Sequence, residues 1–290
     1  MTAIAPSGAI VGIADMKFWT GSIVSACVAA APFLSFSTSA QAGVGDLLVA
    51  PTRIVLDGRK GAEVILNNIG EEPATYRISA EFRRMKADGT LEEIADPSDA
   101  EKAARDMLIF APRRVTLAPR EPQSIRIAAR PPQGLPDGEY RVHLLFRAIP
   151  PATPVEKAPA EPAKGLSFKL IPVYGVTIPV IVRLGNLNVQ AAISDVHVEQ
   201  RDGKPEIALE LSRSGQRSTF GEVRVLKAGV KDPIALSRAV AVYTEINKRE
   251  VLLPVDSAFK GSLSGPVTVQ YVETYDDGSK TIAETQAVLR

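Results

Sequence analysis

Short runs of apolar residues, separated by polar turns, make up most of the chain from residue 47 onward. In residues 74–82, Tyr76, Ile78, Ala80 and Phe82 alternate with polar neighbours, which is typical of a strand with one buried face. Before residue 185 this pattern predicts strands at 47–56, 62–66, 74–82, 108–117, 124–128 and 139–149, and a longer apolar run at 166–184. After it, strands are predicted at 189–199, 206–211, 222–227, 234–244, 250–255, 266–274 and 281–289.

Turn signals between these runs favour antiparallel sheets. Asp-Gly pairs tolerate the positive φ angles of tight hairpins, and they occur at 57–58, 88–89, 137–138, 202–203 and 277–278. Only residues 97–105, rich in Ala and charge, predict a helix, with Ser98 or Asp99 as its cap. Residues 150–164 hold five prolines and predict an extended loop.

Gly185-Asn186 marks the expected domain boundary, because the strand pattern restarts after it. Short strands at this spacing, with turns between them, are typical of β-sandwiches. We therefore expect an all-β fold class with two tandem immunoglobulin-like β-sandwich domains, at 43–185 and 186–290.

Residues 1–42 are predicted to be a cleaved signal peptide. Lys17 supplies a positive charge, and residues 18–36 carry no charged side chain. The tetrapeptide Ser39-Ala-Gln-Ala42 fits the small-x-small pattern that signal peptidase accepts. The alternative of a transmembrane anchor stays open, although polar residues interrupt the apolar stretch and a cleavage site ends it. Export to the periplasm is the predicted localisation.

Two further alternatives concern the same segment. Translation starts at Met1 or at Met16, which directly precedes Lys17. Residues 24–27 resemble a lipoprotein cleavage box ending in Cys27, the only cysteine of the chain. Cleavage after Ala42 would remove that cysteine and leave a mature chain with no disulfide and no thiolate nucleophile.

Charge and motifs argue against most functional classes. The formal net charge is +1, so no overall field attracts nucleic acid. The two histidines, His143 and His197, are expected to be ordinary face or edge residues of strands, because neither has the neighbouring ligands that a metal site needs. Residues 257–260 match a Ser-x-x-Lys pattern without its companion motifs and predict a turn. We predict no catalytic residues, no metal, no cofactor and no small-molecule substrate, and hence no enzyme.

The apolar run at 166–183 is the unusual feature of the sequence. It is about three times the length of an ordinary strand. Pro172 and Pro179 lack the N–H that a central strand needs on both sides, so the run should lie at a sheet edge or be bulged. A long apolar edge suggests pairing with a strand of a partner, whereas the alternative is a core strand that bends between two sheets.

Several segments, in order, resemble one family. Residues 48–56, 63–68 and 73–76 resemble the opening of periplasmic pilus-assembly chaperones of the chaperone–usher pathway. The segment Phe110-Ala-Pro-Arg-Arg-Val-Thr-Leu-Ala-Pro119 and the strand Tyr140-Arg-Val-His-Leu-Leu-Phe-Arg-Ala-Ile-Pro-Pro151 resemble later parts of the same family. The resemblance covers roughly residues 47–185; residues 186–290 share only size and strand pattern with it.

The resemblance implies donor-strand complementation, in which the chaperone lends an edge strand to an incomplete pilus subunit. The groove-filling set would then be Leu166, Phe168, Leu170, Pro172 and Tyr174. The family anchors the C-terminal carboxylate of the subunit between an Arg and a Lys, and Arg53 matches the Arg. Pro179 stands where the Lys is expected, so either another cation such as Lys169 or Arg183 serves, or the anchor is weaker or absent.

The implied function is a periplasmic chaperone that caps pilus or fimbrial subunits and delivers them to an outer-membrane usher, without nucleotide or cofactor. Arg183 would hold the two domains together, and the donor edge could also pair with a second copy of the chain. The alternative is an envelope binding or scaffold protein with the chaperone fold that has no part in pilus assembly, which the missing Lys and the prolines favour.

Overall fold

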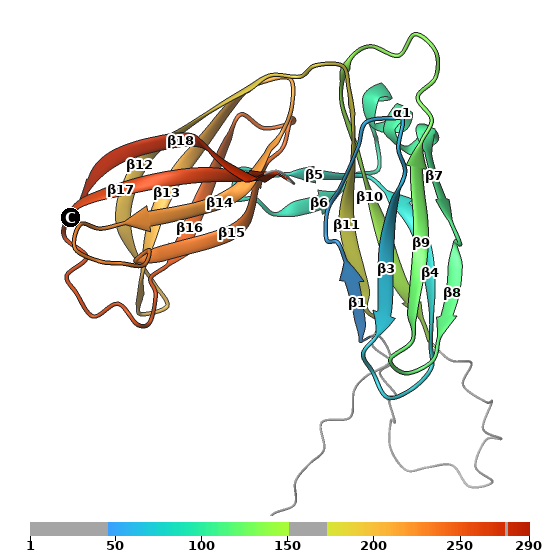
Figure 1. Ribbon diagram of the computed structural model, residues 1–290, viewed down its shortest axis with the longest axis horizontal. Coiled ribbons are helices and arrows are strands. Elements are labelled where there is room, and N and C mark those ends of the chain that lie inside the picture. The colour runs from blue at the N-terminus through green and yellow to red at the C-terminus, as the bar shows by residue number, and fades with distance from the viewer. Residues whose placement is uncertain (1–45, 151–172, 276–277) are drawn as a thin grey trace, which may run out of the picture. The chain divides into compact units, whose positions relative to one another are not determined.

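The computed structural model describes residues 46–150, 173–275 and 278–290 (Figure 1). These residues form two β-sandwiches with one short helix, which confirms the predicted all-β class with two sandwich domains. The predicted signal peptide, Cys27, Lys169 and most of the proposed donor strand (Leu166, Phe168, Leu170 and Pro172) lie outside the described residues. The described residues contain no helix with the length and apolar character needed to span a membrane.

The N-terminal sandwich packs two sheets face to face, in which all strand pairs are antiparallel except the parallel pair of β2 and β11. The β1 sheet has the order β1-β3-β9-β7, and the β11 sheet has the order β2-β11-β10-β4-β8. The elements are β1 (Leu47–Ala50), β2 (Ile54–Leu56), β3 (Ala62–Asn68), β4 (Ala74–Glu81), β5 (Arg83–Met85), β6 (Leu91–Glu93), α1 (Asp99–Met107), β7 (Leu108–Ala111), β8 (Arg114–Leu117), β9 (Pro122–Ala129), β10 (Gly138–Ile149) and β11 (Gly175–Leu184).

The C-terminal sandwich has a three-stranded sheet of order β12-β13-β16 and a four-stranded sheet of order β15-β14-β17-β18. Its strands are β12 (Val189–Arg201), β13 (Lys204–Gly215), β14 (Thr219–Leu226), β15 (Ala235–Val242), β16 (Lys248–Pro254), β17 (Gly265–Tyr275) and β18 (Gly278–Leu289). Each overlaps one of the seven predicted runs. The Asp202-Gly203 hairpin between β12 and β13 has positive φ at both residues, as its turn signal predicts.

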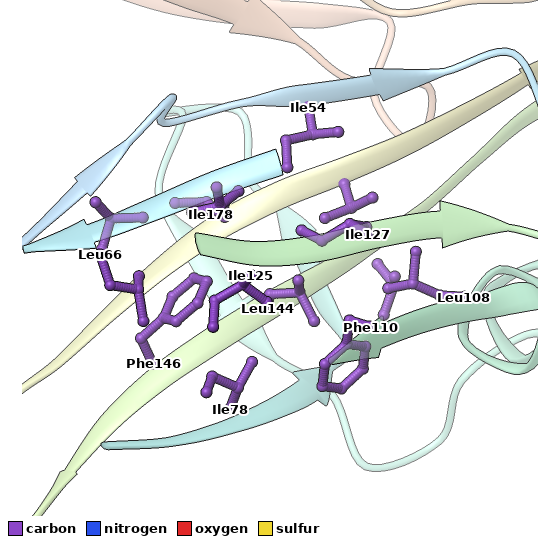
Figure 2. Packing of buried hydrophobic residues seen from close by; sticks show 14 of the residues in the cluster. Ile54, Leu66, Ile78, Leu108, Phe110, Ile125, Ile127, Leu144, Phe146 and Ile178 are labelled. Atoms are coloured by element: carbon purple, nitrogen blue, oxygen red, sulfur yellow. The ribbon is translucent and has the colours of Figure 1, made fainter. Parts of the chain in front are cut away.

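Alternation along the strands builds the core of each sandwich. In β3, Val64 and Leu66 point inward and are fully buried, while Glu63 and Ile65 are exposed. Figure 2 shows how Leu66, Ile125 and Phe146 from both sheets meet between the layers. Burial of each such side chain contributes roughly 1.5–3 kcal/mol. A separate cluster of the same kind fills the C-terminal sandwich.

Two predicted strands are each divided in the structure. The run 47–56 splits at Pro51 into β1 and β2, which belong to different sheets. The run 108–117 splits at Pro112 into β7 and β8, which also lie in different sheets. A proline cannot donate to a ladder, so each becomes the point where the chain crosses from one sheet to the other.

The predicted helix is confirmed, and it extends two residues beyond the predicted end, to Met107. Ser98 caps it: its hydroxyl accepts a bond from the N–H of Glu101, whose carboxylate accepts one from the N–H of Ser98. The turn at Asp88-Gly89 was predicted, but the short strands β5 and β6 that it joins were not. The pairs at 57–58 and 137–138 join no hairpin.

Candidate functional site

Strand β11 presents two different faces. Ile178, Val180 and Val182 are buried in the core of the N-terminal sandwich. The residues between them, Pro179 and Ile181 among them, point to the other side, because successive side chains of a strand alternate. We call that side the outer face of the β11 sheet.

One edge of β11 is open over part of its length. Residues 175–184 all pair with β10, whereas β2 pairs only with Val180, Ile181 and Val182. Among the described residues, the expected edge character therefore holds for residues 175–179, and it is lost at 180–182, where a neighbour lies on each side. Tyr174, just before the strand, is 54% exposed, and its carbonyl accepts a bond of 2.9 Å from the N–H of Ala148.

Pro179 lies on this open stretch, with its nitrogen on the unpaired side. The bond between Ala148 and Tyr174 makes them a hydrogen-bonded pair, and such pairs alternate along an antiparallel ladder. Pro179, opposite His143, therefore falls in a pair without ladder bonds, and its backbone nitrogen faces away from β10. An edge position tolerates the missing N–H, as the sequence predicts.

Arg53 lies at the start of the short β2 ladder. Its chain neighbour Ile54 pairs with Val180, so Arg53 and Pro179 both directly precede the first pair of that ladder. The guanidinium of Arg53 stacks on the ring of Phe220 from the C-terminal sandwich, 4.5 Å from the ring centroid. The position where the resemblance expects a Lys is therefore close in the fold to Arg53, but it carries no charge.

Two of the three guanidinium nitrogens of Arg53 are buried without a hydrogen-bond partner in the described chain. Its Nε and Nη2 atoms have no hydrogen-bond acceptor among the described residues. Burial, and then the positive charge of Arg183, hold the pKa of Arg53 below its ordinary value. The negative charges of Glu139 and Glu273 act in the opposite direction but do not outweigh these effects. Even a lowered Arg pKa leaves the group charged near neutral pH, so this site contains a cation with two buried nitrogens that bind no carboxylate among the described residues.

Arg183 links the two sandwiches through Glu139. Arg183 donates from Nε to Glu139 Oε2 at 2.9 Å and from Nη2 to the carbonyl of Ser218 at 3.1 Å. The same carboxylate oxygen accepts the N–H of Ser218 at 3.0 Å. The Glu139 side chain is fully buried, and its other oxygen has no partner among the described residues. Arg183 is thus engaged by an anion, and Arg53 is not.

A second ion pair on the same face joins Arg141 to Glu245. Arg141 Nη1 donates to Glu245 Oε2 at 2.9 Å, and its guanidinium lies over the ring of Tyr243 at 3.8 Å. Arg141 pairs with Ile181 in the ladder, two residues along from the pair of His143 and Pro179 and on the same face. Arg183 and Arg141 each bind a carboxylate on this face, whereas Nε and Nη2 of Arg53 bind none among the described residues.

His143 corrects the expectation of an ordinary face or edge residue. It is 1% exposed, and neither ring nitrogen has a hydrogen-bond partner in the described chain. Its ring meets Tyr243 edge-on at 6.4 Å. Burial, with smaller contributions from Arg141 and Arg83, lowers the pKa of His143 to about 3, so the ring is neutral at physiological pH. His197 is exposed.

The neighbours of Arg53 were not predicted. Phe220, Glu139 and Glu273 lie far from Arg53 in the chain, and no local pattern distinguishes them from other strand residues. Among the residues that the structure describes, no group of three or more His, Cys, Asp or Glu side chains could hold a metal ion. What the site can do chemically is bind an anion and offer a strand edge.

No family model matches the chain, and no curated protein matches its sequence. The chain is similar to solved structures of chaperones. They include the Pseudomonas aeruginosa CupB2 chaperone (12% identity, 84% of this chain and 100% of that chain, TM-score 0.43) and the E. coli chaperone DraB (16%, 84% and 96%, 0.41). They also include the SafB chaperone, solved with the Salmonella enterica SafA pilin (16% identity, 84% of this chain and 97% of that chain, TM-score 0.42). Such values assign no site or partner to this chain.

Proposed function

We propose that the chain is a periplasmic chaperone that binds pilus or surface-fibre subunits by lending them the strand that leads into β11. The observation that carries the proposal is the guanidinium of Arg53, which has two buried nitrogens without a hydrogen-bond acceptor among the described residues and lies beside an open strand edge at residues 175–179. A subunit would add its own strand along that edge, and its C-terminal carboxylate would accept hydrogen bonds from the unpartnered nitrogens of Arg53.

The apolar set on the leading segment would supply affinity. Leu166, Phe168, Leu170, Pro172 and Tyr174 would fill the open groove of the subunit, at roughly 1.5–3 kcal/mol for each Leu- or Phe-sized side chain. Of these, Tyr174 is described, and its exposed ring is available to a partner. Backbone bonds to the edge would fix the register of the partner strand.

Arg53 would act as the carboxylate anchor without help from a Lys. Its forked donors suit both oxygens of a carboxylate, and its stacking on Phe220 holds the fork in place. Arg183 is a poor second anchor, because Glu139 already neutralises it. Arg183 is better suited to joining the sandwiches through Ser218.

The test is co-purification of the full chain from periplasmic extract with co-expressed pilus-subunit candidates of the same genome. Arg53→Ala should weaken the complex about 10- to 100-fold, which corresponds to about 1.5–3 kcal/mol for a hydrogen bond to a charged group. Phe168→Glu should weaken it further, because a carboxylate would enter an apolar groove. Arg126→Ala is the matched control, since that side chain is 86% exposed on the outside of the β1 sheet.

Equal recovery of the subunit with wild type, Arg53→Ala and Phe168→Glu would contradict the proposed surface. A second candidate function is an envelope scaffold with the same fold that does not assemble pili, and the neutral Pro179 beside Arg53 is the observation that favours it. It predicts that no pilus subunit co-purifies with wild type, while another envelope protein does so in an Arg53-dependent manner.

A further inference from the structure

The β5–β6 hairpin belongs to the N-terminal sandwich by sequence, but it makes contacts with the C-terminal one. Strand β16 pairs with β13 on one side, and its other edge is open to a further strand. There the N–H of Glu250 donates to the carbonyl of Ala87, at the hairpin turn, with a distance of 2.8 Å. The hairpin thus adds a backbone bond to a sheet edge of the other sandwich.

Met85, the last residue of β5, buries its side chain among residues of both sandwiches. It is 6% exposed and shares a small apolar cluster with Ile181, Ala241 and Tyr243. Its N–H donates to Glu245 Oε1 at 2.7 Å, and the same carboxylate binds Arg141. One glutamate of the C-terminal sandwich therefore holds the hairpin backbone and strand β10 together.

The turn of the hairpin is shaped for one neighbour. Gly89 has a φ of +81°, which favours glycine. A Cβ atom at this position would lie 2.3 Å from both Nε and Nη2 of Arg249. Arg249 in turn donates from Nη1 to the carbonyl of Ala241. A side chain on residue 89 would have to displace this guanidinium.

The hairpin is also fastened to its own sandwich. Arg84 binds Glu101 of helix α1 through two bonds, Nε to Oε1 at 2.9 Å and Nη2 to Oε2 at 2.6 Å. The bonds from Arg84 help to lower the pKa of Glu101 to about 2. At the base of the hairpin, the N–H of Ile94 donates to the carbonyl of Phe82 at 3.1 Å. Because the hairpin is bound to both sandwiches, it can restrict their movement relative to each other.

We propose that the β5–β6 hairpin is a brace that holds the two sandwiches in one fixed arrangement. Two domains joined by a short linker move relative to each other unless a sizeable apolar interface prevents it. The brace adds to the contacts between the sandwiches the apolar cluster around Met85, the backbone bond from Glu250 to Ala87 and the bond from the Met85 N–H to Glu245. Ile181 of this cluster lies between Pro179 and Arg183, so the brace also positions the face that carries Arg53.

The test measures the distance between spin labels on the two sandwiches by pulsed electron paramagnetic resonance. Labels at Arg126→Cys and Lys280→Cys, both at exposed positions, are introduced into the full chain with Cys27→Ser, so that no other thiol is present. Wild type should give one narrow distance distribution. The double variant Met85→Asn with Glu245→Ala should broaden it roughly twofold or more, because the domains then move independently.

Two further variants keep the outcome interpretable. Glu245→Gln alone removes only the charge that holds Arg141, and it should broaden the distribution less than the double variant. Glu92→Gln is the matched control on the same hairpin, because Glu92 is exposed and contacts Lys86. The circular dichroism spectrum of each variant checks that both sandwiches stay folded. The brace is refuted if the distance distribution of the double variant is as narrow as that of wild type, or if the wild-type distribution is already as broad as that of the double variant. It is also refuted if Glu92→Gln broadens the distribution as much as the double variant does.

Discussion

Buried His143 should make the stability of the protein depend on pH. The unfolded chain binds a proton at this ring near the ordinary pKa of 6.5, whereas in the folded chain burial lowers the pKa to about 3. Between these values the unfolded state holds more protons, so the free energy of unfolding falls as the pH falls. The contribution is complete above pH 6.5 and is lost progressively toward pH 3.

The magnitude follows from the two pKa values. From pH 7 to pH 5, proton uptake by the unfolded His143 should lower the free energy of unfolding by about 2 kcal/mol. The groups that face the ring do not offset this: Arg141 and Arg83 disfavour its charge, and Tyr243 presents a ring edge. Glu81, which lies opposite in the ladder, forms an ion pair with Arg83.

The perturbation is His143→Leu, measured by urea denaturation at pH 7 and pH 5. From pH 7 to pH 5, the free energy of unfolding of the variant should fall by about 2 kcal/mol less than that of wild type. At pH 7 it should be as stable as wild type or more stable, because two unpaired buried nitrogens are removed. His197→Leu is the control, since that ring is half exposed, and it should keep the wild-type pH dependence. An unchanged pH dependence in His143→Leu would refute the reasoning.

Two other changes test contacts described above. Gly89→Ala should cost more stability than Gly203→Ala. The φ angles are similar, +81° and +74°, but only a Cβ at residue 89 would meet Arg249, while nothing lies within 4 Å of a Cβ at residue 203. Equal losses in thermal unfolding would show that the Arg249 contact is unimportant. Glu139→Ala should lower the free energy of unfolding by about 2–4 kcal/mol, because it leaves Arg183 without its buried anion. A loss below about 0.5 kcal/mol in urea denaturation, as at an ordinary surface position, would contradict that role.

Local patterns predicted those parts of the fold that local forces determine. All seven strands of the C-terminal sandwich follow from alternation and turn residues, and the helix follows from the cap at Ser98. The crossing of the chain between sheets at Pro51 did not follow, because it depends on which neighbour each half-strand finds. The hairpin at 83–93 was missed since its strands are three residues long and charged, and contacts with another domain hold them.

The candidate site shows the same division. The sequence indicated Arg53 and Arg183 through a family resemblance, and the structure places both near the outer face of one sheet. It did not indicate which of them is hydrogen-bonded to a carboxylate. Glu139, which is 44 residues from Arg183 in the chain, binds Arg183, whereas the guanidinium of Arg53 lies over the ring of Phe220. The pairing of strands that are distant in the sequence determines which arginine lies next to Glu139.

The proline in β11 has a consequence for unwanted association. A second molecule that laid a strand along residues 175–179 would find N–H groups at Gly175 and Thr177, but none at Pro179. The interrupted row lowers the gain from indiscriminate sheet extension, as gatekeeper residues do in aggregation-resistant proteins. A concentrated solution of the chain should therefore resist fibril formation better than a Pro179→Val variant, which would offer an unbroken template.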